Sequence, residues 1–307
     1  MKRFENILCY VGGETPQPGI HEAARLAEGN GAKLTLIDVL PESTEGPWLT
    51  LPSKPNLEQL VVAARVADLE EMAAPLEARG LAVRIFLATG SAFVEIIRRT
   101  IEKEHDLVVK TAEGERSHFG LLGTTALHLM RKCPAPVWAV KPSEPKLNRI
   151  LAAVDPDPQN PNALDLNARI LQLAASLAQT RESELQIVHA WWLFSEAALR
   201  GPRIGLPPDE VENLLAGTRA AAQGALDNLM AEVDLGDVPY QADIVQGLPV
   251  DVLTSLSEES DVLVMGTISR SGIEGVLIGN TAESVLRRID CSALVVKPSG
   301  FETPLHF

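Results

Sequence analysis

FGLLGTTALHLMRKCPAPVWAVKP (119–142) returns later in the chain as EGVLIGNTAESVLRRIDCSALVVKP (274–298), once one residue is allowed for. The offset between the two halves is 156 residues: Lys110, Gly123 and Lys141 align with Gly266, Gly279 and Lys297. An offset that holds over more than thirty residues indicates a tandem duplication. The fold must therefore be one unit used twice.

Four more pairs of segments extend the repeat to nearly the whole chain. They are FENILCYVGG (4–13) with LNRILAAVDP (147–156), KLTLIDV (33–39) with ELQIVHA (184–190), AVRIFLATGS (82–91) with YQADIVQGLP (240–249), and HDLVVKTAEG (105–114) with DVLVMGTISR (261–270). We predict a first domain at 1–142, a linker at 143–148 and a second domain at 149–307.

Each half alternates short apolar runs with segments of helical period. The runs are rich in Val, Ile and Leu, as strands buried on both faces are, and the segment 209–233 has apolar residues at helical spacing. This predicts β-α-β-α-β-α-β-α-β in each half and parallel sheets with helices on both faces. In the first half, Pro75 should kink the helix expected at 57–79 or split it.

Composition and charge exclude several classes of protein. The chain has 307 residues, 46% of them hydrophobic, and no apolar run approaches the ~18 residues of a membrane helix. The net charge is −14, of which −12 falls in residues 149–307. A basic surface for nucleic acid or membrane binding is therefore not expected. No signal peptide is readable, so we expect a cytoplasmic protein whose three cysteines (Cys9, Cys133 and Cys291) are buried and reduced.

Ligands of open parallel sheets bind beyond the carboxyl ends of the strands. In the second half, the residues expected there are Asp155, Ala190, Gly247 and Gly266. A glycine-rich loop (266–281) follows, with Arg270 as a cation and a helix starting at Asn280, for which Glu283 would complete a capping box. Such a loop can bind phosphate at the helix N-terminus or can simply serve a tight turn, and both hypotheses stay open. Asp155 is likewise either a ligand contact or a turn residue in DPDPQNP.

The usual catalytic and nucleotide-binding motifs are missing from the sequence. There is no G-x-x-x-x-G-K-[ST], no G-x-S-x-G and no H-E-x-x-H. His189 lies in a buried apolar strand, where a core histidine is expected more often than a catalytic one. Trp191 and Trp192 end that strand, where they favour packing, although they could line a pocket.

Both halves resemble the universal stress protein domain, and the chain as a whole resembles the bacterial tandem type, the E subtype. The resemblance is strongest in GLPVDVL (247–253), DVLVMGTISRSGIEGVLIGNTAESVL (261–286), CSALVVKP (291–298) and GFETP (300–304). It implies two Rossmann-like, nucleotide α-hydrolase-like sheets of five parallel strands in the order 3-2-1-4-5. It also implies that the fifth strands, PVWAVKP (136–142) and SALVVKP (292–298), pair antiparallel across a two-fold axis.

The resemblance also implies a nucleotide site. ATP-binding members of the family carry an Asp after strand one and G-x-x-G-(nine residues)-G-[ST]. The second half matches at Asp155, Gly266 and Gly279 and departs at Ser269 and Asn280, with Thr281 next. In the first half Gly12, Lys110 and Glu113 replace the Asp and the first two glycines, which predicts a degenerate site.

We therefore expect ATP or AMP, with Mg²⁺, in the second half only. Asp155 would face the ribose, the Ala190 backbone the base, and Asn280 and Thr281 the phosphates. The candidate site residues are Asp155, Ala190, Gly247, Met265, Gly266, Ser269, Arg270, Gly279, Asn280 and Thr281.

The functional hypothesis is a stress-response signalling protein that binds a small ligand and changes its choice of protein partners. The alternative is an interaction scaffold without nucleotide, or a protein that binds another small, hydrophobic ligand. No residue is placed as a catalytic base, so we expect no enzyme, with a slow ATPase as the weakest hypothesis. The protein partners are not identified by the sequence, and a second copy of the tandem chain is one candidate.

Overall fold

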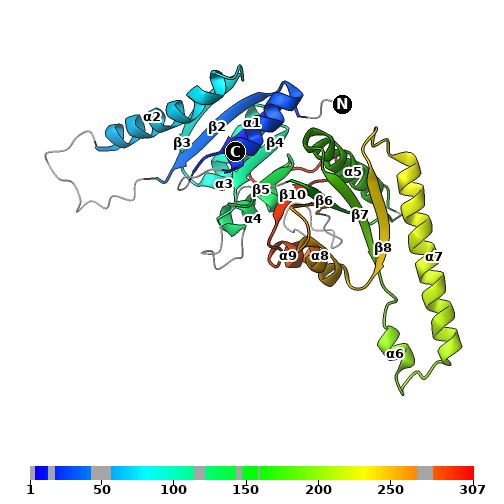
Figure 1. Ribbon diagram of the computed structural model, residues 1–307. Coiled ribbons are helices and arrows are strands. Elements are labelled where there is room, and N and C mark those ends of the chain that lie inside the picture. Colours follow the sequence, from blue (N-terminus) through cyan, green and yellow to red (C-terminus); the bar gives the residue numbers. More distant parts are fainter. Residues whose placement is uncertain are drawn as a thin grey trace, which may run out of the picture. The chain divides into compact units, whose positions relative to one another are not determined.

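The computed structural model describes residues 4–12, 18–42, 57–113, 122–142, 147–157, 160–267 and 279–307 (Figure 1). The chain divides into two compact units. The first unit comprises residues 1–145 together with 302–307, and the second comprises residues 146–301. The C-terminal hexapeptide, which the sequence assigns to the second domain, thus groups with the first, where the Phe307 ring lies 5.2 Å from the guanidinium carbon of Arg98.

The first unit alternates strands and helices as predicted. Its described elements are β1 (Asn6–Tyr10), α1 (Pro18–Asn30), β2 (Lys33–Leu40), α2 (Leu57–Glu77), β3 (Val83–Thr89), α3 (Ala92–Glu102), β4 (Leu107–Thr111), α4 (Gly123–Lys132) and β5 (Val137–Val140). Its strands follow the order β3-β2-β1-β4-β5, and all of its described pairings are parallel. The predicted order 3-2-1-4-5 is confirmed.

The second unit repeats this plan with one added helix. Its described elements are β6 (Arg149–Ala153), α5 (Pro161–Arg181), β7 (Glu184–Trp191), α6 (Glu196–Arg200), α7 (Pro208–Glu232), β8 (Tyr240–Gln246), α8 (Pro249–Ser257), β9 (Val262–Gly266), α9 (Asn280–Leu286) and β10 (Ser292–Val296). The order β8-β7-β6-β9-β10 is again 3-2-1-4-5, with parallel pairs. The pairing of the two fifth strands stays a prediction.

Apolar strands form the core because both faces of each sheet carry helices. Ile7, Leu8 and Cys9 of β1 have no exposed surface, and β10 is buried along its whole length. All three cysteines are buried, as predicted, and burial raises the pKa of the Cys9 thiol to about 12. The alternative that Pro75 splits the helix is wrong: α2 runs as one element through Pro75, which lies in its last turn and therefore ends no more than the final residues of the helix.

One carboxylate sets the register of the central strands in each unit. Asp106 accepts hydrogen bonds from the backbone N–H groups of Glu5 (2.6 Å) and Asn6 (3.2 Å). Asp261 accepts them from Asn148 (2.8 Å) and Arg149 (2.9 Å). The two aspartates are therefore equivalent, and they are 155 residues apart rather than 156.

This corrects the alignment of the fourth strands by one residue. Tyr10 pairs with Lys110 in the first unit, and Ala153 pairs with Met265 in the second. Lys110 thus stands where the second unit has Met265, and Thr111 stands at the position of Gly266. The sequence offset returns to 156 at Gly123 and Gly279, because the second half has one more residue between Gly266 and Gly279 than the first has between Thr111 and Gly123.

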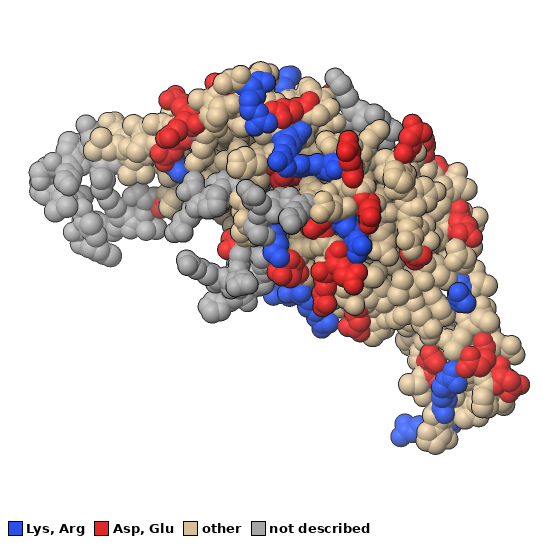
Figure 2. All heavy atoms as spheres, viewed as in Figure 1, with Lys and Arg blue, Asp and Glu red and all other residues tan. Residues whose placement is uncertain are grey.

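The surface agrees with the expectation from charge. On the face shown in Figure 2, the described lysines and arginines are scattered among aspartates and glutamates and do not gather into one basic patch. Among the described residues, no helix is both long enough and apolar enough to cross a membrane.

Candidate functional site

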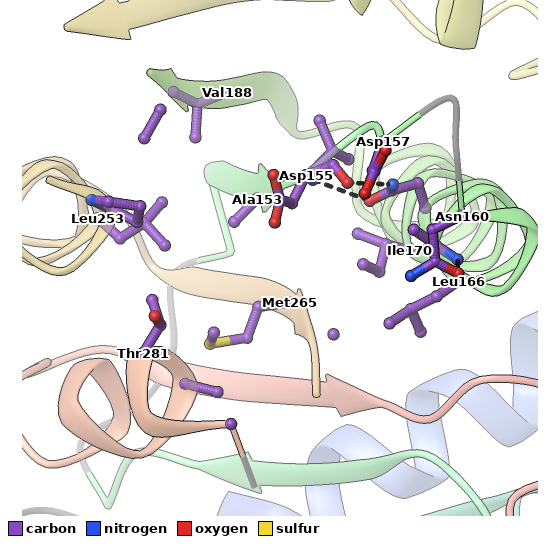
Figure 3. Close-up of a pocket in the computed structure, with 18 of the residues that line it drawn as sticks. Ala153, Asp155, Asp157, Asn160, Leu166, Ile170, Val188, Leu253, Met265 and Thr281 are labelled. Atoms are coloured by element: carbon purple, nitrogen blue, oxygen red, sulfur yellow. Dashed lines mark hydrogen bonds between the residues drawn. The ribbon is translucent and has the colours of Figure 1, made fainter. Parts of the chain in front are cut away.

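A cavity of about 660 Å³ opens in the second unit at the carboxyl ends of β6 and β9 (Figure 3). The chain leaves β6 for β7 on one side, whereas β9 lies on the other, so the strand order reverses here. This reversal is where open α/β sheets bind their ligands, and the volume lies within the usual range for small-molecule sites.

The floor of the cavity comes from three strands in register. Ala153 of β6 pairs with Val188 of β7 on one side and Met265 of β9 on the other, and all three line the space. Ala190 lines it two residues further along β7. The small side chain of Ala153 at the centre of the floor leaves the volume open.

The walls are mostly apolar. Leu166 and Ile170 of α5 form one side, and Leu253 of α8 lies across the cavity from them in Figure 3. Trp192, which follows β7 and is 40% exposed, also lines the space. A flat aromatic or otherwise apolar group would thus contact protein on both sides.

Asp155 is held at the rim by an amide from α5. The Asp155 N–H donates to Oδ1 of Asn167 (3.0 Å), and Nδ2 of Asn167 donates to the Asp155 carbonyl oxygen (2.9 Å). Asn167 is only 3% exposed. The clamp uses only backbone atoms of Asp155, so it fixes the backbone of this exposed residue without using its carboxylate. Asp157 and Asn160 line the same end of the cavity (Figure 3).

Seven of the ten predicted site residues line this cavity: Asp155, Ala190, Met265, Gly266, Gly279, Asn280 and Thr281. Ser269 and Arg270 lie outside the described residues. Gly247 does not line the cavity, and its role is in the backbone. Its φ is +146°, a Cβ there would lie 2.8 Å from Cγ2 of Val252, and Gly90 has the matching turn in the first unit with φ +141°.

Gly266 serves helix packing as well as the cavity. A Cβ on Gly266 would lie 2.5 Å from Cδ2 of Leu166 and 3.0 Å from Cδ1 of Ile170. The absence of a side chain lets α5 approach β9. In the first unit the glycine of this helix–strand contact lies on the helix instead. Thr111 of β4 packs against Gly19 of α1 and accepts a hydrogen bond from its N–H (3.0 Å).

The helix at the far end differs in detail from the prediction. α9 begins at Asn280, as expected, but Gly279 is the N-cap and has no side-chain cap bond. Glu283 is engaged elsewhere, because it accepts from Arg287 at 2.8 Å, so the capping box is wrong. Asn280 and Thr281 nevertheless present exposed polar side chains to the cavity.

His189 is a core residue. Its Nδ1 lies 3.3 Å from the Val154 carbonyl oxygen, which places the proton on Nδ1. Burial lowers the pKa of His189, while the Asp155 charge and the bond to Val154 act in the opposite direction. The described residues that line the cavity include no histidine, lysine, arginine or cysteine.

Sequence reasoning missed Asn167, Asn160 and the apolar walls. An Asx residue twelve positions after Asp155 carries no motif, and Leu166, Ile170 and Leu253 look like ordinary core residues of helices. Of the pair Trp191 and Trp192, which the sequence indicates as residues that could line a pocket, Trp192 lines the cavity.

The fold and cavity define a tandem α/β protein of the doubly wound type, with a cavity in the second unit where the strand order reverses. Comparison with family models gives the particular family: the Universal stress protein family matches residues 3–141 and again 146–297. The chain belongs to this family and carries two of its domains.

Individual relatives span the same length. The chain is 29% identical to universal stress protein E of Escherichia coli K12, with 100% of this chain and 98% of the relative covered. It is 27% identical to universal stress protein E of Photorhabdus laumondii, covering 99% and 98%.

Solved structures share the fold. A protein of unknown function from Pseudomonas aeruginosa PAO1 superposes with a TM-score of 0.75 at 22% identity, covering 98% of this chain and 95% of that one. A universal stress protein from Archaeoglobus fulgidus superposes with a TM-score of 0.62 at 20% identity, covering 97% of each chain.

Proposed function

We propose that the second unit binds an adenine nucleotide, ATP or AMP, in the cavity at the ends of β6 and β9. The observation that carries the proposal is the fixed Asp155, held by Asn167 at the rim of an apolar cavity. A carboxylate accepts hydrogen bonds from a ribose, and apolar walls suit a base ring. The Ala190 backbone would lie near the base, and Asn280 and Thr281 near the phosphates.

Charge bears on which nucleotide binds. The described lining carries Asp155 and Asp157 and no basic residue, so it offers a polyphosphate no direct neutralisation. Mg²⁺ carried by the phosphates would supply positive charge. Among the described residues no cluster of three or more histidine, cysteine or acidic side chains is placed to hold a metal by itself. We therefore expect AMP to depend less on Mg²⁺ than ATP does.

We further propose that the protein binds its ligand to change its choice of partners and does not turn it over. A hydrolase needs a group that activates water, and the described lining of the cavity contains no histidine or lysine that could serve as the base. Phosphate release from ATP no faster than in a protein-free control is the expected result.

Isothermal titration of the full chain with AMP, and with ATP and Mg²⁺, tests the proposal. One equivalent per chain is expected. Asp155→Ala should weaken binding by roughly 10- to 100-fold through loss of a charge-assisted hydrogen bond, without unfolding the rim, because Asn167 holds only the backbone there. Asp227→Asn on α7, which does not line the cavity, is the matched control.

The outcomes separate the hypotheses. If neither nucleotide gives a heat of binding and no nucleotide co-purifies with the protein, the proposal fails. The remaining hypotheses are then a scaffold without nucleotide and a protein that binds a hydrophobic ligand. Two equivalents per chain would show that the first unit also binds.

A further inference from the structure

The strand register identifies what stands in the first unit where the second has its cavity. The floor of the cavity is Val188, Ala153 and Met265. The same three register positions in β2, β1 and β4 are Ile37, Tyr10 and Lys110. An alanine is thus replaced by a tyrosine at the centre of the floor, and a methionine by a lysine beside it.

The Tyr10 ring folds back over the chain. Its Oη and Cζ lie so close to Gly12 that a Cβ at this residue would overlap them. Gly12 is two residues after Tyr10, as Asp155 is two residues after Ala153, so the phenol covers the position from which Asp155 faces the cavity. Burial raises the pKa of Tyr10 to about 12, and the charges of Asp38 and Glu113 add to the rise, which places Tyr10 in the field of both carboxylates.

Beside Tyr10 lies an ion pair. Lys110 is 3% exposed, and its Nζ lies 3.3 Å from Oε1 of Glu113. Burial lowers the pKa of Lys110, whereas Glu113 opposes that change. A lysine so deeply buried needs a negative partner, and here the protein itself provides it.

The Glu113 carboxylate also lies against the start of α4. Gly123, the first residue of this ten-residue helix, has φ +74°, and any side chain on it would collide with that carboxylate. Gly123 aligns in sequence with Gly279, which is the N-cap of α9 and lines the cavity of the second unit. A protein carboxylate therefore stands beside the residue that, in the second unit, faces open space.

We infer that the first unit is closed by its own side chains: Tyr10 lies over Gly12, and the Glu113 carboxylate, paired with Lys110, acts as a built-in replacement for a bound anion. The unit is complete without a ligand, and any response to a ligand is left to the second unit. This inference concerns the first unit alone and holds whether or not the second unit binds nucleotide.

Removal of the internal anion and its replacement from solution test the inference. Glu113→Ala in the full chain leaves Lys110 buried beside a space the size of a small carboxylate. Since the Glu113 side chain is 39% exposed, solvent moderates the loss, and we expect a melting transition lowered by about 5 °C. Sodium formate should restore at least half of that shift relative to sodium chloride at equal ionic strength.

Two controls make the result specific. Glu71→Ala removes an exposed acid of α2 and should show neither the loss nor a formate effect. The double variant Lys110→Met with Glu113→Gln has no buried cation, so formate should not stabilise it, and it remains informative if Glu113→Ala fails to fold. A Glu113→Ala melting temperature equal to wild type, or equal stabilisation by formate and chloride, would overturn the inference.

A transplant provides a second test. Ala153→Tyr places the first unit's tyrosine at the centre of the floor of the second unit's cavity. If AMP binds the wild-type chain, this variant should lose that binding at least tenfold while remaining folded by circular dichroism. If AMP does not bind the wild-type chain, the proposed function fails and the formate experiment still decides this inference.

Discussion

Asn167 and Asp155 are joined by two hydrogen bonds that involve both the N–H and the C=O of Asp155, at 3.0 and 2.9 Å. The amide comes from α5 and the backbone from the end of β6, so one side chain fixes the point where the chain leaves the sheet. Because Asn167 is buried, water cannot replace it without a structural change.

Asn167→Ala should therefore affect both stability and binding. Loss of the amide leaves two backbone groups without their partner, and we expect the free energy of unfolding to fall by about 2 kcal/mol. Ligand affinity should fall as well, since Asp155 is no longer positioned. Asn167→Asp keeps an acceptor for the Asp155 N–H but sets an oxygen against the Asp155 carbonyl and buries a charge, so it should lose at least as much stability. Urea denaturation measures both variants, and equal stability of wild type and Asn167→Ala would contradict the clamp.

His105 should make the protein less stable in mild acid. It is 6% exposed, its Nδ1 lies 3.3 Å from the Asn6 carbonyl oxygen, and burial lowers its pKa from 6.5 to about 4, with Arg99 adding to the effect. The unfolded chain takes up the proton near pH 6.5 and the folded one only near pH 4. The contribution is complete above pH 6.5 and is lost as the pH falls toward 4, by at most about 3 kcal/mol.

Comparison with His105→Asn isolates the contribution of His105 to the pH dependence of stability. The difference in unfolding free energy between the variant and wild type should change between pH 7 and pH 4.5. Asp106, whose pKa is raised by burial, acts in the opposite direction at lower pH, so measurements should stay above its titration. Parallel curves for wild type and His105→Asn would show that His105 does not titrate as described.

Arg65 and His189 satisfy the same carbonyl in the two units. Arg65 Nη2 donates to the Val11 oxygen (3.2 Å), and His189 contacts the equivalent Val154 oxygen. Arg65 also pairs through Nε with Asp38, whose side chain is 5% exposed. Arg65→Met should cost about 3 kcal/mol in unfolding free energy because it leaves a buried carboxylate without its cation. The double variant with Asp38→Asn should recover part of that loss, and a double variant that is no better than the single would exclude this explanation.

Most of the fold could be predicted because the repeat and the strand pattern are written in residue types. Apolar runs such as those at 149–153 and 262–266 are typical of strands in a sheet that is buried on both faces. Asp155 could be predicted as a site residue because it directly follows such a run, and the same holds for Gly266.

The residues around them were less accessible to prediction. Asn167 acts through two hydrogen bonds whose partners depend on how α5 lies against β6, which no spacing encodes. Glycine is needed for different reasons at the two positions: Gly247 adopts a positive φ, whereas Gly266 leaves room for a closely packed helix.

The alignment of the two halves shows the limit most clearly. The offset between Gly123 and Gly279, carried back through the loop, aligns Lys110 with Gly266. The second half has one more residue between the strand and this glycine, so the constant offset does not hold in the strand. The pairing of Tyr10 with Lys110 and of Ala153 with Met265 corrects this alignment, and it makes Thr111 the equivalent of Gly266.

The corrected alignment yields a prediction about volume exchange. In the second unit Gly266 makes room for Leu166, and in the first Gly19 makes room for Thr111. Gly266→Thr alone should lower the unfolding free energy by about 2 kcal/mol through overpacking against α5. Leu166→Ala alone should lower it by about 3 kcal/mol through the cavity it leaves. In the double variant the threonine enters the space that the leucine has left, so its loss should be smaller than the sum by about 1 kcal/mol or more. Denaturant titration of the four proteins gives the coupling. Strict additivity would mean that the two residues do not share one space.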